Sequence, residues 1–284
     1  MKYPDPRPKW QMRNAFRRQG IYWLPNAITT CGLFAGFYAI VQAMNLRFEL
    51  AAIGIFAAMV FDGLDGRVAR LTRTQSAFGA EYDSLADMVA FGVAPALVLY
   101  EWELKGIGRL GWLAAFIYCG CAALRLARFN TNIGHVDKRF FQGLPSPAAA
   151  GLVAGFVWAM EAYQIRGLPW VAWLLAVIAG FTMVSNIRFY SGKEINLRKA
   201  VPFRVVVLIA FSVVIVVQMA DNLPELLFAL FLLYALSGYV LWISNLAKRR
   251  EQSVVPPRKE PGSKEPGSKE PGINEPEGKE PERS

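Results

Sequence analysis

Apolar residues fill most of the chain in continuous runs of roughly 17 to 25 residues, separated by short charged connectors. Each run matches the length of helix that crosses about 30 Å of hydrocarbon. The pattern predicts an all-α fold, a polytopic membrane helical bundle with about eight transmembrane helices. The expected spans are residues 26–44, 50–71, 83–100, 110–130, 147–163, 168–187, 203–220 and 224–246.

The two ends of the chain differ from this apolar centre. Residues 8–23 mix aromatic side chains with Lys and Arg, which predicts an interfacial amphipathic helix on an anionic membrane; an ordinary basic flank is the alternative. Residues 251–284 repeat Lys-Glu-Pro-Gly-Ser and are expected to be disordered. The predicted organisation is a cytoplasmic interfacial segment over 1–24, a transmembrane domain over 25–250 and a low-complexity cytoplasmic tail over 251–284.

The positive charges indicate how the spans are oriented. The N-terminus, alternate connectors and the C-terminal flank together hold 21 Lys and Arg residues, whereas the connectors of the other side hold four. The positive-inside rule therefore places both termini in the cytoplasm and favours an even number of spans. The first 20 residues contain no continuous apolar run, so we expect no cleavable signal peptide.

Composition narrows the classes of partner and site. The chain is 54% hydrophobic with a formal net charge of +9, which favours anionic lipids as partners, and it has no nucleic-acid-binding motif. His135 is the single histidine, so sites built from several histidines are excluded, and we expect it to be a bystander. The cysteines lie in apolar segments and are expected to be free: Cys31, Cys119 and Cys121.

One charged segment interrupts the second and third apolar runs. The stretch from Leu50 to Phe61 is about 18 Å of helix, too short to cross a membrane, and the chain then continues DGLDGRVAR. Two further acids, Asp83 and Asp87, open the third run. Ionisable residues inside spans are costly and usually face one another or a wet cavity. The segment is therefore the first candidate for a functional site.

Helical spacing brings these acids together. Asp62 and Asp65 share a face at i, i+3, and Asp83 and Asp87 share a face at i, i+4. Both pairs stand at the cytoplasmic ends of consecutive antiparallel spans, so the four carboxylates are expected to converge and to bind two divalent cations, Mg²⁺ or Mn²⁺. A structural ion-pair network and a cation channel or transporter are the alternatives. The arginines available to such a network are Arg67, Arg70 and Arg73.

The same residues fit a known pattern. The string Asp62-x2-Asp65-Gly66-x2-Ala69-Arg70-x8-Gly79-x3-Asp83-x3-Asp87 resembles the complete signature of the CDP-alcohol phosphotransferases. Enzymes of that family transfer a phosphatidyl or related group from a CDP-linked donor to an alcohol and release CMP. Four further segments look like the membrane-embedded phosphatidylserine synthases of the family: LPNAITT (24–30), ALRLARFN (123–130), GLPSPAAAG (143–151) and VPF (201–203).

The resemblance implies a reaction and a set of site residues. CDP-diacylglycerol and L-serine are the implied substrates, with glycerol 3-phosphate or an inositol phosphate as alternative acceptors. The four acids are the implied metal ligands, and we expect Asp87 also to be the general base in a direct transfer to the serine hydroxyl. The expected donor-binding residues are Asn26, Thr29, Thr30, Gly66, Arg70, Ser76 and Gly79.

Serine carries a carboxylate, so an acceptor site needs a cation. Arg125, Arg128 and Asn130 at the cytoplasmic end of the fourth span are expected to bind this carboxylate or a donor phosphate. For the two arginines the alternative is snorkelling to the membrane surface, and for Asn26, Thr29 and Thr30 it is capping and interhelical hydrogen bonding. The resemblance also implies a homodimer in the cytoplasmic membrane of a bacterium.

Overall fold

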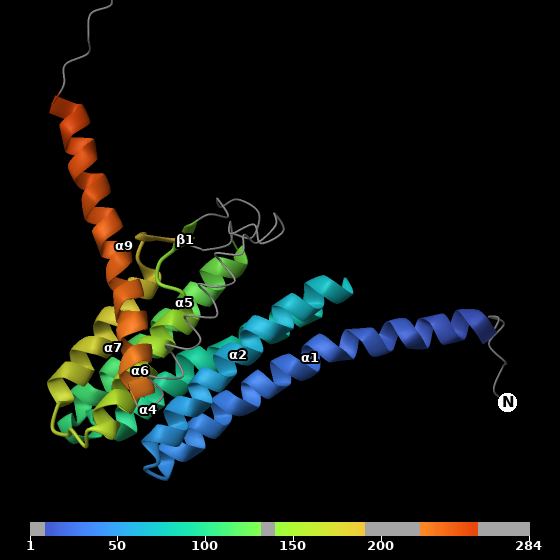
Figure 1. Ribbon diagram of the computed structural model, residues 1–284, viewed down its shortest axis with the longest axis horizontal. Helices are drawn as coiled ribbons and strands as arrows, with labels where there is room; N and C mark the ends of the chain where they lie inside the picture. Colours follow the sequence, from blue (N-terminus) through green and yellow to red (C-terminus); the bar gives the residue numbers. More distant parts are fainter. Residues whose placement is uncertain (1–8, 132–139, 191–221, 255–284) are drawn as a thin grey trace, which may run out of the picture. The chain divides into compact units, whose positions relative to one another are not determined.

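The structure is a computed structural model that describes residues 9–131, 140–190 and 222–254. The chain divides into two units, Met1–Asn245 and Leu246–Ser284, and the candidate site lies in the first. In that unit α1 and α2 lie side by side, and α5 packs on α7 (Figure 1).

Helices make up nearly all of the described chain. They are α1 (Lys9–Met44), α2 (Phe48–Thr72), α3 (Ala77–Asp87), the π-helical turn η1 (Met88–Val93), α4 (Ala94–Trp102), the 3-10 turn η2 (Leu104–Ile107), α5 (Arg109–Thr131), α6 (Ser146–Ala162), α7 (Pro169–Val184) and α9 (Leu223–Val254). Two short strands, β1 (Phe140–Gln142) and β2 (Arg188–Tyr190), pair antiparallel.

Four described helical stretches are long and apolar enough to cross a membrane. They are Trp23–Met44, Ala77–Trp102, Arg109–Thr131 and Leu223–Ser244. The second stretch runs through α3, η1 and α4, and α7 is apolar but has only 16 residues. These helices confirm the class, an all-helical membrane protein. The total of eight spans stays a prediction, and the expected span over 203–220 lies outside the described residues.

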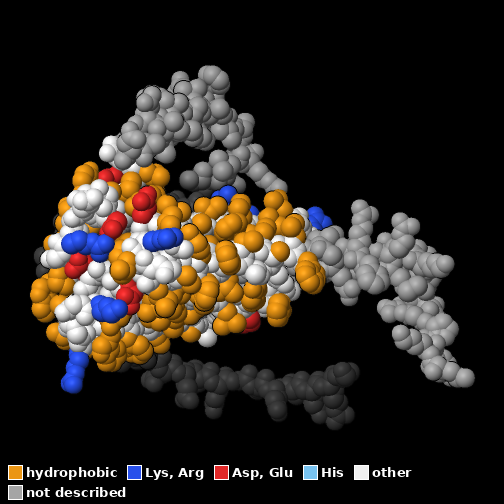
Figure 2. Space-filling view, turned by 90° about the horizontal axis from the view of Figure 1, so that it is seen from below, with side chains coloured by type: hydrophobic (Ala, Val, Ile, Leu, Met, Phe, Trp, Pro, Cys, Tyr) orange, Lys and Arg blue, Asp and Glu red, His pale blue; other side chains and the backbone are white. Residues whose placement is uncertain are grey.

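Exposed side chains agree with a lipid environment. One stripe of α7 exposes Trp170, Leu174, Ile178 and Phe181, which lie three or four residues apart and so share one helix face. Hydrophobic side chains cover much of the face seen in Figure 2, and charged side chains gather mainly at one end of it. A large apolar surface of this kind would be a liability in water but suits the interior of a bilayer.

The first helix differs from the prediction. The sequence suggested an interfacial helix that ends before Pro25, whereas α1 runs without a break from Lys9 to Met44 with Pro25 inside it. A proline removes one helical hydrogen bond, and the helix continues on both sides of it. The candidate span begins at Trp23. The interfacial, amphipathic character of residues 8–23 stays a prediction.

At the C-terminus, α9 also exceeds its predicted bound. The expected tail began at residue 251, whereas α9 ends at Val254. Residues 255–284, which hold the Lys-Glu-Pro-Gly-Ser repeats, lie outside the described part of the chain.

Small residues let the helices that carry the acids approach α1. A Cβ added to Gly36 in α1 would lie only 2.7 Å from the Cα of Ala90 in η1, and one added to Gly54 in α2 would lie 3.0 Å from the carbonyl oxygen of Ala35. Close helix packing of this kind needs glycine or alanine at the contact. The α1–α2–η1 contact therefore fixes how the ends of α2 and α3 face each other.

A cluster around Arg166 ties helix ends together in the loop between α6 and α7. Its guanidinium lies 4.8 Å from the centre of the Phe48 ring, donates a hydrogen bond to the carbonyl of Trp102 and pairs with Glu161 at 2.7 Å. Cation–π contacts and ion pairs of this kind stabilise partly desolvated sites. The cluster joins the start of α2 to the ends of α4 and α6.

Candidate active site

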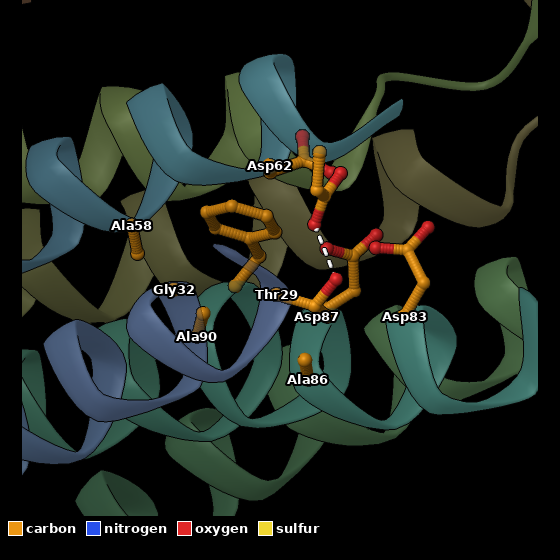
Figure 3. A pocket seen from close by; sticks show the side chains of 10 residues that line it. Thr29, Gly32, Ala58, Asp62, Asp83, Ala86, Asp87 and Ala90 are labelled. Carbon is orange, nitrogen blue, oxygen red and sulfur yellow. Dashed lines mark hydrogen bonds between the residues drawn. The ribbon is translucent and has the colours of Figure 1, made fainter. Parts of the chain in front are cut away.

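Three carboxylates from two helices meet at one point. Asp62 on α2 and Asp83 and Asp87 on α3 each offer one oxygen, and the three oxygens lie within 4.8 Å of one another. Figure 3 shows the three side chains pointing toward a common centre. The i, i+4 spacing places the two acids of α3 on one face, and the antiparallel turn after α2 brings that face opposite Asp62.

The turn that makes this meeting possible is short. Arg73 ends α2 with a left-handed backbone, at φ 56°, and the amide of Thr74 bonds to the carbonyl of Ala69 at 3.1 Å. Ser76 then caps α3 by accepting a hydrogen bond of 3.0 Å from the amide of Gly79. A left-handed residue followed by a serine cap is a common way to end one helix and begin the next.

The fourth acid, Asp65, lies in the same pocket but is held differently. Its Oδ2 accepts a hydrogen bond of 2.7 Å from the hydroxyl of Thr29 in α1, and Asp65 is only 4% exposed. The dashed line in Figure 3 marks this bond. Asp65 is not among the acids whose oxygens converge within 4.8 Å, which are Asp62, Asp83 and Asp87. The four predicted ligands therefore divide into a converging trio and one carboxylate oriented by Thr29.

The donor set and the space fit a hard cation. The pocket is lined by Thr29, Gly32, Ala58, Asp62, Asp65, Asp83, Ala86, Asp87, Ala90 and Phe91. Its free space of about 10 Å³ is close to that of one water molecule. Carboxylate oxygens are the ligands that Mg²⁺ and Mn²⁺ prefer, and like charges this close are costly without a cation between them.

A π-helical turn follows Asp87 directly. Met88–Val93 adopt this rare geometry, and the hydroxyl of the buried Tyr118 on α5 donates a hydrogen bond of 3.2 Å to the carbonyl of Phe91 within it. Single π-helical turns are frequent at functional sites because they re-aim the residues beside them. The turn places Asp87 at the junction of α3 and η1, and no pattern in the sequence predicts it.

The structural ion-pair network, one of the alternatives, is represented among the described residues by one electrostatic interaction, between Arg70 and Asp65. The ion pairs among the described residues are Lys105–Glu101 and Arg166–Glu161, and neither involves an acid of the site. The cation that interacts electrostatically with both Asp62 and Asp87 is instead Arg125, a residue far along the sequence.

Two of the residues expected to bind the donor, Gly66 and Arg70, follow Asp65 on α2. A Cβ added to Gly66 would meet nothing closer than the Arg70 guanidinium at 3.8 Å, so the surroundings of Gly66 are open. Arg70 itself is exposed. An open glycine beside an exposed guanidinium leaves room for a phosphate group to approach the helix backbone.

The first helix carries three more of the residues expected to bind the donor. The Asn26 Oδ1 would lie 3.4 Å from a Cβ added to Gly79, which places these two residues in contact across α1 and α3. Thr30 donates a hydrogen bond of 2.7 Å to the carbonyl of Asn26, and its hydroxyl lies 2.9 Å from the hydroxyl of Tyr82. The structure thus brings Asn26, Thr30 and Gly79 together, with Thr29 one position away facing Asp65.

Arg125 is the basic residue that the structure brings to the acids. The residue is half-buried, interacts electrostatically with Asp87 and Asp62, and donates a hydrogen bond of 2.6 Å from Nη1 to the hydroxyl of Ser146. Its Nε is buried and has no hydrogen-bond partner among the described residues. A buried, unpaired donor beside the site is expected to be satisfied by a ligand.

Arg128 has different surroundings. It donates hydrogen bonds to the carbonyl of Val184 at 3.1 Å, to the Gln142 side chain at 2.5 Å and to the Asn186 side chain at 2.6 Å. These contacts tie α5 to the segments that flank β1 and β2. Its nearest described partners are therefore structural, and Arg125 is the better placed of the two arginines for a substrate group.

Asn130 contacts a serine on the helix that carries two of the acids. Its Nδ2 donates a hydrogen bond of 3.0 Å to the hydroxyl of Ser84, which lies on α3 next to Asp83. The pair links the end of α5 to the helix that carries Asp83 and Asp87. The sequence analysis singled out Asn130 but missed Ser84, since a lone serine in a helix has no distinguishing pattern.

Comparison with known proteins identifies the class. Residues 22–182 match the family model described as CDP-alcohol phosphatidyltransferase. A curated CDP-diacylglycerol–serine O-phosphatidyltransferase from Helicobacter pylori is 39% identical over 232 residues, which cover 80% of this chain and 94% of that protein. One from Methanocaldococcus jannaschii is 35% identical over 228 residues, covering 80% and 98%. One from Saccharomyces cerevisiae is 40% identical over 150 residues, covering 47% and 53%.

The chain therefore belongs to the CDP-alcohol phosphatidyltransferase family. The family predicted from the signature between Asp62 and Asp87 is confirmed, and with it the class of enzyme, a phosphotransferase. The family depends on divalent cations, in agreement with the acid cluster of this chain.

Proposed function

We propose that the protein transfers a phosphatidyl group from CDP-diacylglycerol to the hydroxyl of L-serine, forming phosphatidylserine and CMP in phospholipid biosynthesis. The observation that carries the proposal is the convergence of Asp62, Asp83 and Asp87 beside the half-buried Arg125. The similarity to curated serine phosphatidyltransferases supports serine as the acceptor.

The acids provide the donor half of the site. Asp62, Asp83 and Asp87 would hold divalent cations. Asp65 would be the fourth ligand, oriented by its hydrogen bond from the hydroxyl of Thr29. When bound, two such ions, Mg²⁺ or Mn²⁺, offset the charge of the pyrophosphate and stabilise CMP as the leaving group. In this proposal Gly66 and Arg70 bind the phosphates of the donor, supported by the open space around Gly66. The nucleotide is bound by Asn26, Thr29, Thr30, Ser76 and Gly79, some of which contact one another between α1 and α3.

Asp87 and Arg125 provide the acceptor half. Arg125 binds the carboxylate of serine, and Asp87 takes the proton of the serine hydroxyl as its oxygen attacks the β-phosphorus of the donor. The bond between that phosphorus and the bridging oxygen breaks, and the electron pair leaves with CMP. Arg125 interacts electrostatically with Asp87, so one short amino acid can engage both. Asn130 and Arg128, on the same helix as Arg125, are proposed to border this half of the site.

The membrane arrangement follows the sequence patterns. We infer eight spans with both termini in the cytoplasm and residues 8–23 lying on the anionic membrane surface. Residues 25–250 form the catalytic domain, preceded by the interfacial segment 1–24 and followed by the tail 251–284, in which α9 extends to Val254 and the repeats beyond it are proposed to be disordered. The protein is proposed to work as a homodimer in the cytoplasmic membrane of a bacterium, in contact with anionic lipids but not with nucleic acid.

An acceptor panel tests the proposed function. The purified protein is given CDP-diacylglycerol and Mg²⁺ or Mn²⁺, and CMP release is measured with L-serine, glycerol 3-phosphate or an inositol phosphate added separately. We expect release to depend on L-serine. CMP release with only a phosphorylated acceptor would agree with the proposed role of the acids in donor binding but would show that serine is not the acceptor.

The transporter alternative makes a different prediction. A cation transporter would carry Mg²⁺ or Mn²⁺ across the membrane of proteoliposomes and release no CMP. We expect serine-dependent CMP release and no metal flux above that of protein-free liposomes.

A further inference from the structure

The helix that carries Asp83 and Asp87 continues into a turn that a proline follows. The π-helical turn η1 spans Met88–Val93, and Pro95 stands at the start of α4. In a regular α-helix the amide of residue 95 would donate a hydrogen bond to the carbonyl of Phe91, but a proline has no amide hydrogen, and its ring crowds the carbonyl four residues before it. The carbonyl of Phe91 is therefore left without its α-helical donor.

A side chain from another helix donates to this carbonyl instead. The hydroxyl of Tyr118 on α5 lies 3.2 Å from the carbonyl oxygen of Phe91 and donates a hydrogen bond to it. Tyr118 is only 1% exposed, so the bond is shielded from water. A buried carbonyl without a donor is costly, and the hydroxyl of Tyr118 supplies the donor that Pro95 lacks.

The rest of η1 is held by close packing on two sides. A Cβ added to Gly36 in α1 would lie 2.7 Å from the Cα of Ala90, and one added to Gly92 would lie 3.3 Å from the Cβ of Ala122 in α5. Tyr118 and Ala122 are four residues apart, so one face of α5 makes both the packing contact and the hydrogen bond. The turn is thus fixed between α1 and α5.

This turn also forms one wall of the acid pocket. It begins at the residue after Asp87, and both Ala90 and Phe91 line the pocket together with the converging acids. Asp87 and Phe91 are four residues apart, about one helical turn. A displacement of the Phe91 carbonyl therefore changes the backbone that carries Asp87, and with it the direction in which the carboxylate points.

We propose that Tyr118 is a positioning residue of the active site, whose hydrogen bond to the carbonyl of Phe91 keeps η1 in the shape that aims Asp87 at a divalent cation. The proposal rests on the proposed function, since it assumes that Asp87 is a ligand of that cation and the base of the transfer. Tyr118 acts through the backbone of η1 and not by contact with a substrate.

The first test measures metal binding without substrates. Mn²⁺ alone is titrated into the purified wild type, Tyr118→Phe and a matched control, Tyr239→Phe, and free Mn²⁺ is followed by electron paramagnetic resonance. Both variants remove one phenol hydroxyl, but the hydroxyl of Tyr239 contacts Thr182 in α7. We expect Tyr118→Phe to raise the Kd for Mn²⁺ about tenfold, as for other groups that orient metal ligands, and Tyr239→Phe to keep the wild-type Kd. An unchanged Kd in Tyr118→Phe, or equal rises in the two variants, would overturn the proposal.

A double-mutant cycle tests whether the hydroxyl acts through the carbonyl of Phe91. Pro95→Ala returns an amide hydrogen at position 95, which can donate to this carbonyl in place of Tyr118. The effect of Tyr118→Phe on the Kd for Mn²⁺ should therefore shrink to about twofold or less in the Pro95→Ala background, whatever Pro95→Ala does by itself. Equal effects of Tyr118→Phe in the two backgrounds would overturn the proposal, because the hydroxyl would then act elsewhere.

Transfer kinetics separate this inference from the proposed function. With CDP-diacylglycerol, L-serine and Mn²⁺, Tyr118→Phe should lower kcat for CMP release about tenfold or more, because the base is misaligned, and leave the KM for L-serine unchanged. If the wild type binds Mn²⁺ but shows no serine-dependent CMP release, the proposed function is wrong. If the wild type depends on serine and Tyr118→Phe matches it in kcat and in the Kd for Mn²⁺, only the inference on Tyr118 is wrong.

Discussion

The hydroxyl of Thr29 donates a hydrogen bond of 2.7 Å to the buried carboxylate of Asp65, joining the first helix to the acid cluster. The two residues are 36 positions apart in the chain and lie on neighbouring helices. Groups that hydrogen-bond a metal ligand set its orientation and tune its affinity for the ion. Thr29 is therefore proposed to position Asp65, in addition to lining the nucleotide pocket.

This relationship predicts the effect of replacing Thr29. Thr29→Val keeps the shape of the side chain but removes the donor, so Asp65 loses its orientation. We expect the concentration of Mg²⁺ or Mn²⁺ that gives half-maximal CMP release to rise about 10-fold or more. Thr29→Ser retains the hydroxyl and is expected to stay close to the wild type. A metal dependence of Thr29→Val equal to that of the wild type would contradict the positioning role.

Asp87 is expected to be the most sensitive position of the site. Asp87→Asn removes a ligand charge and the base, so the rate of transfer should fall by about 10³-fold or more. The measurement is CMP release by the purified, monodisperse variant, with Tm as the check on folding. Glu81→Gln, an exposed change on the same helix, is the control for loss of one negative charge. Wild-type release by Asp87→Asn would refute its role as base.

Ser146 is predicted to act through Arg125. Ser146→Ala leaves a second nitrogen of the half-buried Arg125 without its partner, so the side chain loses its fixed position. The KM for L-serine should rise about fivefold or more, whereas the KM for CDP-diacylglycerol should not change. Ser244→Ala, an exposed serine of α9, serves as control. If only the KM for CDP-diacylglycerol rises, Arg125 binds a phosphate of the donor and not the carboxylate of serine.

The loop that leads into α6 depends on Gly143. Its φ is +78°, its amide bonds to the carbonyl of Ile187 at 2.9 Å, and an added Cβ would overlap the carbonyl oxygen of Met183. Gly143→Ala should lower the free energy of unfolding by about 1–3 kcal/mol or more, because the backbone is strained and the loop must move. Gly120→Ala, where an added Cβ meets nothing within 4 Å, should leave the Tm within a degree or two. Equal Tm values for the two variants would contradict this reading of the loop.

The C-terminal tail is predicted to be dispensable for catalysis. A chain truncated after Arg250 keeps the acids and Arg125; it loses the last turn of α9 and the repeats, which cannot form a pocket. We expect kcat and both KM values to match those of the full chain. A large fall in kcat for a stably expressed truncated chain would show that the tail contributes to the site.

The acid cluster was predictable because its determinants are local. The spacing of Asp62 from Asp65 and of Asp83 from Asp87 fixes which side chains share a helix face. Two consecutive apolar runs joined by a short connector must be antiparallel, so both pairs meet at one end. The hydrogen bond that turns Asp65 toward Thr29 was not predictable, because it depends on how α1 packs against α2.

The acceptor side was less predictable because it depends on contacts between distant segments. Arg125 and Arg128 look equivalent in the sequence, at i and i+3 on one helix. The structure separates them, because Arg128 contacts Gln142 and Asn186 beside the β1–β2 ladder and Arg125 faces Ser146 and the acids. No local sequence pattern predicts that residues 140–142 and 188–190 pair as strands.

The ends of the helices were also only partly predictable from the local sequence. The lengths of the apolar runs predicted the four candidate membrane spans, which lie in α1, in α3 to α4, in α5 and in α9. They did not predict the continuation of α1 through Pro25 or the π-helical turn after Asp87. In both cases the packing of neighbouring helices overrides the local preference of the chain.

The most direct test of the central claim is to measure both products of the reaction at once. The purified protein is incubated with CDP-diacylglycerol, L-serine and Mg²⁺ or Mn²⁺, and CMP and phosphatidylserine are quantified in parallel samples with and without a chelator. We predict equal molar amounts of the two products, formed only with L-serine and a divalent cation, and neither product from Asp87→Asn. CMP release without phosphatidylserine, or phosphatidylserine formation that persists in the chelator, would contradict a metal-dependent transfer to serine at this site.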